Sequence, residues 1–198
     1  ATARATPGLS AAQVDAMSTR TEYNTEVKNS EGVVVLPGNS RVTDTYDPTR
    51  LVALADGTQV QARPHTSTTY DQGAPTTLNP TTQQHWSLPT TITTGASSPG
   101  AAPGTPDLQV ISTVVNGYTK LNPADATEGD PWTLGSPSTV TTAGITRKTR
   151  VDTAGRVTDT RQPISNGADA GTTKTAYYTV AAQAAPNAAC GGKPEWAG

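Results

Sequence analysis

Ile145-Thr-Arg-Lys-Thr-Arg-Val-Asp-Thr-Ala-Gly-Arg-Val-Thr-Asp-Thr160 is the stretch of the sequence that decides the expected fold. β-Branched residues alternate on both sides of a break at residues 152–155, which is typical of two strands joined by a tight turn. Asp152 can accept hydrogen bonds from nearby backbone amides, and Gly155 can adopt a positive φ without steric cost. The pattern predicts a β-hairpin whose second strand begins at Arg156.

The same stretch contains Val-Asp-x-x-Gly-Arg-Val, which resembles the core of an RHS repeat, also called a YD repeat. The usual form of that repeat is Tyr-Asp-x-x-Gly-Arg-Leu within a pair of short strands. Residues 43–51 keep Tyr-Asp and Arg-Leu but lack the glycine, and residues 68–73 keep Tyr-Asp with a glycine one residue early. The residues expected to form repeat turns are Tyr46, Asp47, Arg50, Tyr70, Asp71, Gly73, Asp152, Gly155 and Arg156.

The resemblance to actinobacterial RHS proteins of the polymorphic-toxin type implies a fold and a role. Hairpins of that family wind side by side into a large spiral β-sheet that closes into a hollow shell, often around a toxic C-terminal domain. The implied partners are the rest of the same polypeptide and its encapsulated effector, and the implied location is secreted or at the cell surface. Tyr46 and Tyr70 are then expected to pack on neighbouring strands, while Asp47, Asp71 and Asp152 brace the turns.

The composition is poor in material for a compact core. Only 33% of the residues are hydrophobic and 5% aromatic, and the chain contains no Phe. Such a chain is either partly disordered or one layer of a larger assembly that buries one face of an extended sheet. Abundant Thr and Val favour the sheet, because both residue types suit a pleated, half-buried surface. We therefore expect an all-β fold.

Three regions are expected along the chain. Residues 1–20 form a lead with one short helix, the only one expected, because Ser10 and Gln13 have the spacing of a capping box. Residues 21–180 form degenerate hairpin repeats with loops at about 95–106 and 122–137. Residues 181–198 form a connector that continues into a further C-terminal part; they include Cys190, which is either buried as a small apolar residue or paired with a cysteine elsewhere.

Alternation and turn residues predict further strands within the repeat region. The expected pairs are 22–28 with 33–36, 52–55 with 58–61, and 108–115 with 118–121; single strands are expected at 90–94 and 172–180. Asp56-Gly57 and Asn116-Gly117 separate the partners of the last two pairs, and both dipeptides favour a type I′ turn.

Charge and motif content indicate a non-enzymatic protein. The net charge is −2 with 15% charged residues, so no basic patch predicts nucleic-acid binding, and no apolar run is long enough for membrane insertion. The only histidines, His65 and His85, lack metal-ligand spacing, and we expect surface or hydrogen-bonded roles for them. The acidic residues Asp125, Glu128 and Asp130 depart from the EF-hand spacing. We expect no catalytic residues, metal site or cofactor.

A carbohydrate-binding or adhesive surface module remains the alternative. In that class of protein, exposed aromatic side chains on a polar β-face stack against sugar rings of a cell-surface glycan. The residues available for such stacking are Trp86, Trp132, Tyr177 and Tyr178.

Overall fold

A computed structural model describes residues 8–177 of the 198-residue chain, and the fold is all-β, as expected. The strands are β1 (Arg20–Tyr23), β2 (Val27–Lys28), β3 (Val34–Leu36), β4 (Val42–Tyr46), β5 (Arg50–Ala53), β6 (Gln59–Tyr70), β7 (Pro89–Ser97), β8 (Gln109–Gly117), β9 (Thr139–Thr142), β10 (Ile145–Val151), β11 (Val157–Arg161) and β12 (Thr172–Lys174). The helices are α1 (Ala11–Ala16) and α2 (Pro131–Leu134). Tyr178 and Cys190 lie outside the described residues.

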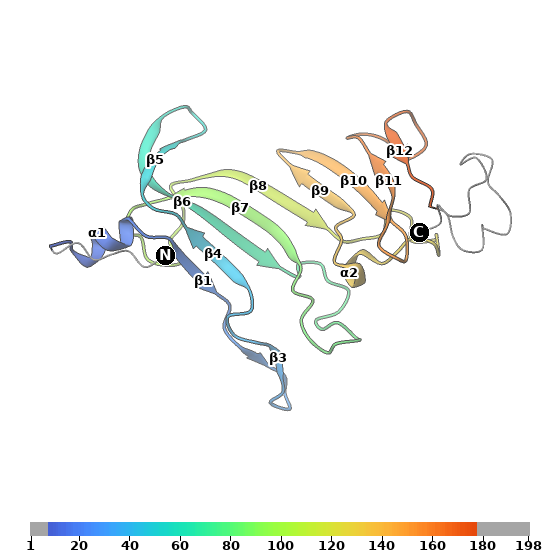
Figure 1. Ribbon diagram of the computed structural model, residues 1–198, viewed down its shortest axis with the longest axis horizontal. Coiled ribbons are helices and arrows are strands. Elements are labelled where there is room, and N and C mark those ends of the chain that lie inside the picture. The colour runs from blue at the N-terminus through green and yellow to red at the C-terminus, as the bar shows by residue number, and fades with distance from the viewer. Residues whose placement is uncertain (1–7, 178–198) are drawn as a thin grey trace.

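The strands form one long antiparallel sheet that follows chain order closely (Figure 1). Its order is β1-β4-β6-β7-β8-β9-β10-β11-β12, with β5 paired to β6, while β2 and β3 form a separate hairpin. Within residues 8–177, β1 and β12 each have a single neighbour, so both outer edges of the sheet are open. This near-sequential order is the meander expected of chained hairpins.

The longest strand, β6, changes partner midway. Its first part pairs with β5 up to Ala62, and its later part pairs with β4 from His65 onward. Pro64 lies at this change of partner, where a proline without an N–H removes no hydrogen bond from either ladder. The carbonyl of Pro64 accepts from the backbone amide of Asp47, which fixes the corner between β4 and β5.

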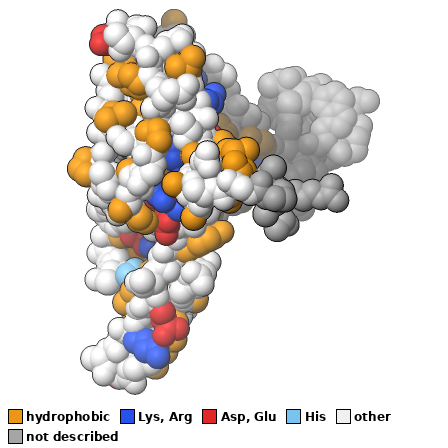
Figure 2. Space-filling view, turned by 90° about the vertical axis from the view of Figure 1, so that its left-hand side faces the viewer, with side chains coloured by type: hydrophobic (Ala, Val, Ile, Leu, Met, Phe, Trp, Pro, Cys, Tyr) orange, Lys and Arg blue, Asp and Glu red, His pale blue; other side chains and the backbone are white. Residues whose placement is uncertain are grey.

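The sheet is a single layer with little apolar core. One buried apolar cluster contains Val52, Ala62 and Ala96, with Leu54 and Val60 packed beside it. The helices have six and four residues, too short to cover a face of the sheet. Figure 2 shows hydrophobic side chains scattered in separate groups over one side of the molecule. Fully exposed and half-exposed apolar side chains are therefore common, as in a thin wall.

The hairpin at 145–160 forms as predicted. β10 and β11 pair antiparallel, and the backbone amide of Asp152 donates to the carbonyl of Arg156 at 2.9 Å. Gly155 has a φ of 79°, which closes the turn. The preceding hairpin, β9 with β10, turns through Ala143 (φ 50°) and Gly144 (φ 76°). Sequence analysis missed this turn because alanine rarely adopts a positive φ.

The capping box of α1 is confirmed, because the side chains of Ser10 and Gln13 satisfy each other's backbone amides. The expectation of a single helix is wrong. Asp130 caps α2, with Pro131 in the first turn, inside the loop expected at 122–137. A proline after an N-cap aspartate is a helix-start signal that the irregular surroundings concealed.

Two expected turns differ in the structure. β5 and β6 do form a hairpin, but Asp56 does not have the positive φ of a type I′ turn; the loop is wider, and the amide of Leu54 donates to Thr58. The hairpin expected around Asn116-Gly117 is absent, because both residues lie inside β8 and pair with β9. The Asn116 side chain donates to the carbonyl of Pro89, so contacts from another strand override the local turn preference.

Other strand limits also shift. The segment expected at 22–28 divides, since β1 pairs with β4 and only β2 pairs with β3. The strand expected at 90–94 extends to Ser97, so the loop expected at 95–106 begins three residues later. The strand expected at 172–180 ends at Lys174 within the described residues.

Replacement of Gly155 tests the turn that organises the β10–β11 hairpin. Gly155→Val should destabilise the protein by about 1–3 kcal/mol, because a β-branched residue at positive φ is strained. The strain is conformational rather than steric, since a Cβ at this position meets only Leu134, at 3.8 Å. Gly155→Asn is the matched control and should cost less, because asparagine tolerates this region. Urea unfolding measures both, and a valine variant as stable as the wild type contradicts the turn geometry.

Candidate functional site

A row of planar polar side chains crosses four strands of the sheet. Arg20 on β1 pairs with Tyr46 on β4, and Tyr46 pairs with His65 on β6. The rings of Tyr46 and His65 are stacked at 4.2 Å with an interplanar angle of 3°, and the Arg20 guanidinium lies 4.2 Å from the Tyr46 ring centroid. Tyr46 is only 2% exposed. The tyrosine of the first Tyr-Asp pair therefore packs between neighbouring strands.

His65 lies between two carboxylates. Its Nε2 is 3.0 Å from Oδ1 of Asp44, and its Nδ1 is 2.9 Å from Oδ1 of Asp107. An ionised carboxylate only accepts hydrogen bonds, so both contacts are satisfied when both ring nitrogens donate, the form with a positive charge. The hydrogen-bonded role expected for His65 is confirmed. The ring joins β4 and β6 to the chain just before β8.

The row depends on the missing side chain at position 95. Gly95 on β7 pairs with His65, and a Cβ there would overlap the carboxylate of Asp107. Because glycine leaves this space open, Asp107 reaches across β7 to the imidazole ring. Gly95 therefore lies inside a strand and allows Asp107 to come close to the backbone. The Gly, Ser, Pro and Ala residues around it instead suggest a flexible loop.

Arg63 links the sheet to α1 and to the corner between β4 and β5, where Tyr46 and Asp47 lie. It is 2% exposed, and its Nη1 donates to Oδ2 of Asp15 on α1 at 2.7 Å. Its Nε donates to the carbonyl of Asp47, and its Nη2 donates to the carbonyls of Ser18 and Tyr46. One buried cation therefore satisfies three backbone carbonyls and one carboxylate, as a buried charge requires.

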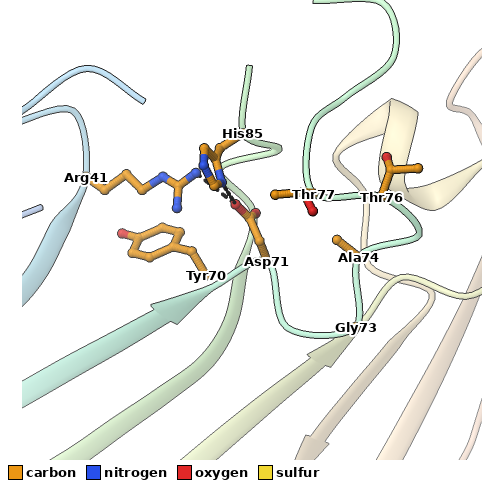
Figure 3. Close-up of a pocket in the computed structure, with 8 residues that line it drawn as sticks. All are labelled: Arg41, Tyr70, Asp71, Gly73, Ala74, Thr76, Thr77 and His85. Atoms are coloured by element: carbon orange, nitrogen blue, oxygen red, sulfur yellow. Dashed lines mark hydrogen bonds and ion pairs between the residues drawn. The ribbon is translucent and has the colours of Figure 1, made fainter. Parts of the chain in front are cut away.

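Three more of the expected repeat-turn residues, Tyr70, Asp71 and Gly73, lie at a second location, the end of β6 (Figure 3). A cavity of about 390 Å³ is lined by Arg41, Tyr70, Asp71, Gly73, Ala74, Thr76, Thr77 and His85. Nη2 of Arg41 donates to Oδ2 of Asp71 at 2.8 Å, and Nδ1 of His85 is 3.7 Å from the same oxygen. The side chains of Arg41 and Asp71 are 8% and 12% exposed. Sequence segments more than 40 residues apart thus meet in one polar cavity.

The three Tyr-Asp-like pairs share one structural position. Tyr46, Tyr70 and Val151 are each the last residue of a strand, and an aspartate follows each of them directly. The aspartates then act differently: the Asp47 amide donates to Pro64, while Oδ1 of Asp71 accepts from the amide of Leu88 at 2.9 Å. Arg50 begins β5 and is exposed, and Gly73 has a φ of 76° in the loop after β6.

The turn after β10 has the fullest set of carboxylate contacts. Oδ1 of Asp152 accepts from the amides of Ala154 and Arg156, each at 2.9 Å, and Oδ2 accepts from the Arg156 side chain at 2.8 Å. These contacts, the Arg156 amide first, hold the pKa of Asp152 below its ordinary value. The Arg156 guanidinium also lies over the ring of Tyr177 at 4.6 Å.

The aromatic residues named for glycan stacking do not form an open platform. Trp132 is 8% exposed and packs against Tyr118 and Trp86, at 4.8 and 5.6 Å between ring centroids. The indole of Trp86 donates to the carbonyl of Thr76, so it braces the loop between β6 and β7. Of the described residues in that set, Tyr177 is the most open, at 41%, and Arg156 occupies one face of its ring. The expectation of Trp132 as a stacking surface is wrong.

The carboxylates of the acidic loop are engaged by protein groups. Arg150 forms ion pairs with both Asp125 and Glu128. Asp125 also accepts from Thr127, Glu128 accepts from the amides of Leu121 and Asn122, and Asp130 caps α2. In residues 8–177, no group of three or more His, Cys, Asp or Glu side chains is placed to hold a metal ion. No helix in the same range has the length and apolar character needed to span a membrane.

Comparison of the chain with protein-family models, with curated proteins and with solved structures gives no match. The resemblance to RHS repeats thus rests on the motif residues and on where they lie in the sheet.

Gly95→Ala tests the contact between Asp107 and His65. The added methyl displaces the carboxylate, and we expect a loss of about 1–3 kcal/mol, because a buried charged group loses its partner. Gly38→Ala is the control, since a Cβ there has its nearest contact at 3.4 Å, to the amide nitrogen of Glu26, and should be close to neutral. In an Asp107→Ala background the cost of Gly95→Ala should largely disappear. Additive losses in this double-mutant cycle, measured by urea unfolding, contradict the proposed cause.

Asp152 should make acid unfolding depend on the β10–β11 turn. Its pKa is lower in the folded chain, so its contribution to stability is complete above the unfolded pKa of about 3.9 and disappears as pH falls through the folded value. The difference in unfolding midpoint between wild type and Asp152→Asn should therefore be largest near neutral pH and shrink below about pH 4. Thr153→Ala is the control and should give a difference independent of pH. An Asp152→Asn difference that is also constant from neutral to acid pH contradicts the assignment.

Proposed function

We propose that this chain is a wall segment of an RHS-type shell that encapsulates and helps to deliver a C-terminal toxin or effector domain. The observation that carries the proposal is the shared position of the three Tyr-Asp-like pairs at strand ends in a single antiparallel meander. A degenerate repeat keeps its structural position when its sequence changes, and the three pairs follow this rule. Aspartate favours turns in any protein, so the weight of the observation lies in the recurrence together with the meander.

The architecture supports this role for a physical reason. The sheet is one layer thick, and β1 and β12 leave unpaired edges within the described residues. Exposed edges of this kind favour pairing with further strands, and a spiral sheet removes them by placing the next hairpin alongside. The small apolar cluster around Val52, Ala62 and Ala96 suits a wall that has solvent on both faces.

The proposed partners follow from the same reasoning. The neighbouring turns of the same polypeptide would pair with β1 and β12, and the effector domain would lie inside the enclosed volume. This arrangement needs no catalytic residue in the wall. A secreted or cell-surface location is part of the proposal, since an effector enclosed for delivery acts outside the cell that makes it.

Electron microscopy of the native protein that carries this sequence tests the proposal. We expect hollow particles with density inside the lumen, and loss of that density when the effector portion is deleted. A solid or elongated particle overturns the shell assignment.

Hydrogen exchange provides a second test on the same molecules. Edge amides of β1 and β12 should exchange rapidly in the 198-residue chain and slowly in the longer native polypeptide, because neighbouring strands then pair with them. Amides in the central strands β6 and β7 serve as the control and should be protected in both. Equal exchange of the edge amides in both proteins contradicts pairing with further hairpins.

A further inference from the structure

The cavity at the end of β6 holds more hydrogen-bonding capacity than its own residues use. Figure 3 shows Arg41, Asp71 and His85 gathered on one side, with Thr77 on the other side of Asp71. Its volume of about 390 Å³ falls within the range of about 300–1,000 Å³ typical of small-molecule sites.

Arg41 leaves donors available in the cavity. Its Nε donates to Oγ of Ser87 at 3.1 Å, and one N–H of Nη2 donates to Asp71 at 2.8 Å. A guanidinium carries five N–H groups, so three, including both on Nη1, have no partner among residues 8–177. The ion pair with Asp71 and the packing of Arg41 over the Tyr70 ring, at 5.1 Å, hold the group in a fixed orientation.

Asp71 and Tyr70 leave acceptors available beside those donors. Oδ1 of Asp71 accepts one backbone amide, from Leu88, and Oδ2 accepts from Arg41. A carboxylate offers about four acceptor positions, so about two remain. The Tyr70 hydroxyl donates to the carbonyl of Val42 at 2.8 Å and keeps its acceptor capacity.

Thr77 and His85 add groups of both kinds. The Thr77 hydroxyl has no hydrogen-bond partner among residues 8–177, and a hydroxyl both donates and accepts. His85 contributes an imidazole whose Nδ1 is 3.7 Å from Asp71, too far for a direct hydrogen bond. The positive charge of Arg41 and the negative charge of Asp71 cancel at close range.

The presence of both donors and acceptors around a neutral ion pair indicates which class of ligand fits the cavity. An anion such as phosphate would be repelled by the Asp71 carboxylate, whereas a cation would be repelled by Arg41. A sugar hydroxyl donates and accepts at once, so neighbouring hydroxyls can bond to a carboxylate and a guanidinium together. We infer that this cavity binds a neutral, hydroxyl-rich ligand, namely a free sugar or the terminal sugar residue of a glycan. This site is separate from the Trp132 cluster, and it does not depend on the shell proposal.

The test is a titration of the 198-residue chain, followed by nuclear magnetic resonance at constant pH and ionic strength. The probes are glucose, galactose, mannose and N-acetylglucosamine, their β-linked tetrasaccharides, and sodium phosphate as the anion. The signals of the Arg41 Nε–H group and the His85 ring report on the cavity. We expect saturable shifts with at least one neutral sugar, and a tighter interaction with the tetrasaccharide if a glycan end is the ligand.

Thr77→Val provides the variant, because Thr77 is exposed and its hydroxyl makes no contact within the described fold. Loss of one hydrogen bond should weaken sugar binding by about two- to tenfold. Thr173→Val, an equally exposed change on β12, is the matched control and should bind as the wild type does. Equal affinity in Thr77→Val and the wild type overturns the assignment of the site.

Two other results also overturn the inference. The first is the absence of a saturable shift with every sugar at concentrations on the order of 100 mM, far above the millimolar dissociation constants of weak binders. The second is a saturable shift with phosphate alone, which identifies an anion site. Neither result bears on particle shape or edge pairing, so failure here is distinguishable from failure of the shell proposal.

Discussion

The stacked row that runs from Arg20 through Tyr46 and His65 to Asp107 is the interaction on which the sheet depends. It crosses β1, β4, β6 and β7 and ends on the chain before β8, so it joins segments that are up to 87 residues apart in the sequence, at residues 20 and 107. Aromatic and cation–π contacts contribute about 0.5–2 kcal/mol each, and hydrogen bonds between charged groups about 1.5–3 kcal/mol. Because the apolar cluster of the sheet is small, such a row supplies part of the stabilisation that a hydrophobic core gives in other folds.

The features that could be predicted from the sequence are those that local hydrogen bonds decide. The capping box of Ser10 and Gln13 and the turn at Asp152 each form contacts within five residues, so their patterns are visible in a short window. Asn116-Gly117 failed for the opposite reason. Both residues pair with β9, and the Asn116 side chain donates to the carbonyl of Pro89 on β7, so these contacts outweigh the turn preference of the dipeptide.

The polar sites were harder to predict than the fold. Tyr46, Tyr70, Asp71 and Asp152 stand out by motif, and each lies at or just after a strand end. Their partners carry no motif. Asp107 reaches His65 only because β7 has a glycine there, and Arg41, just before β4, meets Asp71, just after β6, because these two strands pair antiparallel. The one available signal was the alternation of Arg63 and His65, two charged or titratable residues on one face of a Thr-rich strand.

A core built from ion pairs and stacked rings also suits a wall with water on both faces. An apolar core needs a second layer to cover it, whereas the polar partners here lie within the thickness of one sheet: Arg63 donates to Asp15 and to backbone carbonyls, and His65 contacts Asp44 and Asp107. Burial of such groups is costly when any partner is missing, so the register of the strands is strongly specified. A single-layer sheet of this kind can extend by adding hairpins at its edges without rebuilding its interior, which is the property that a spiral shell requires.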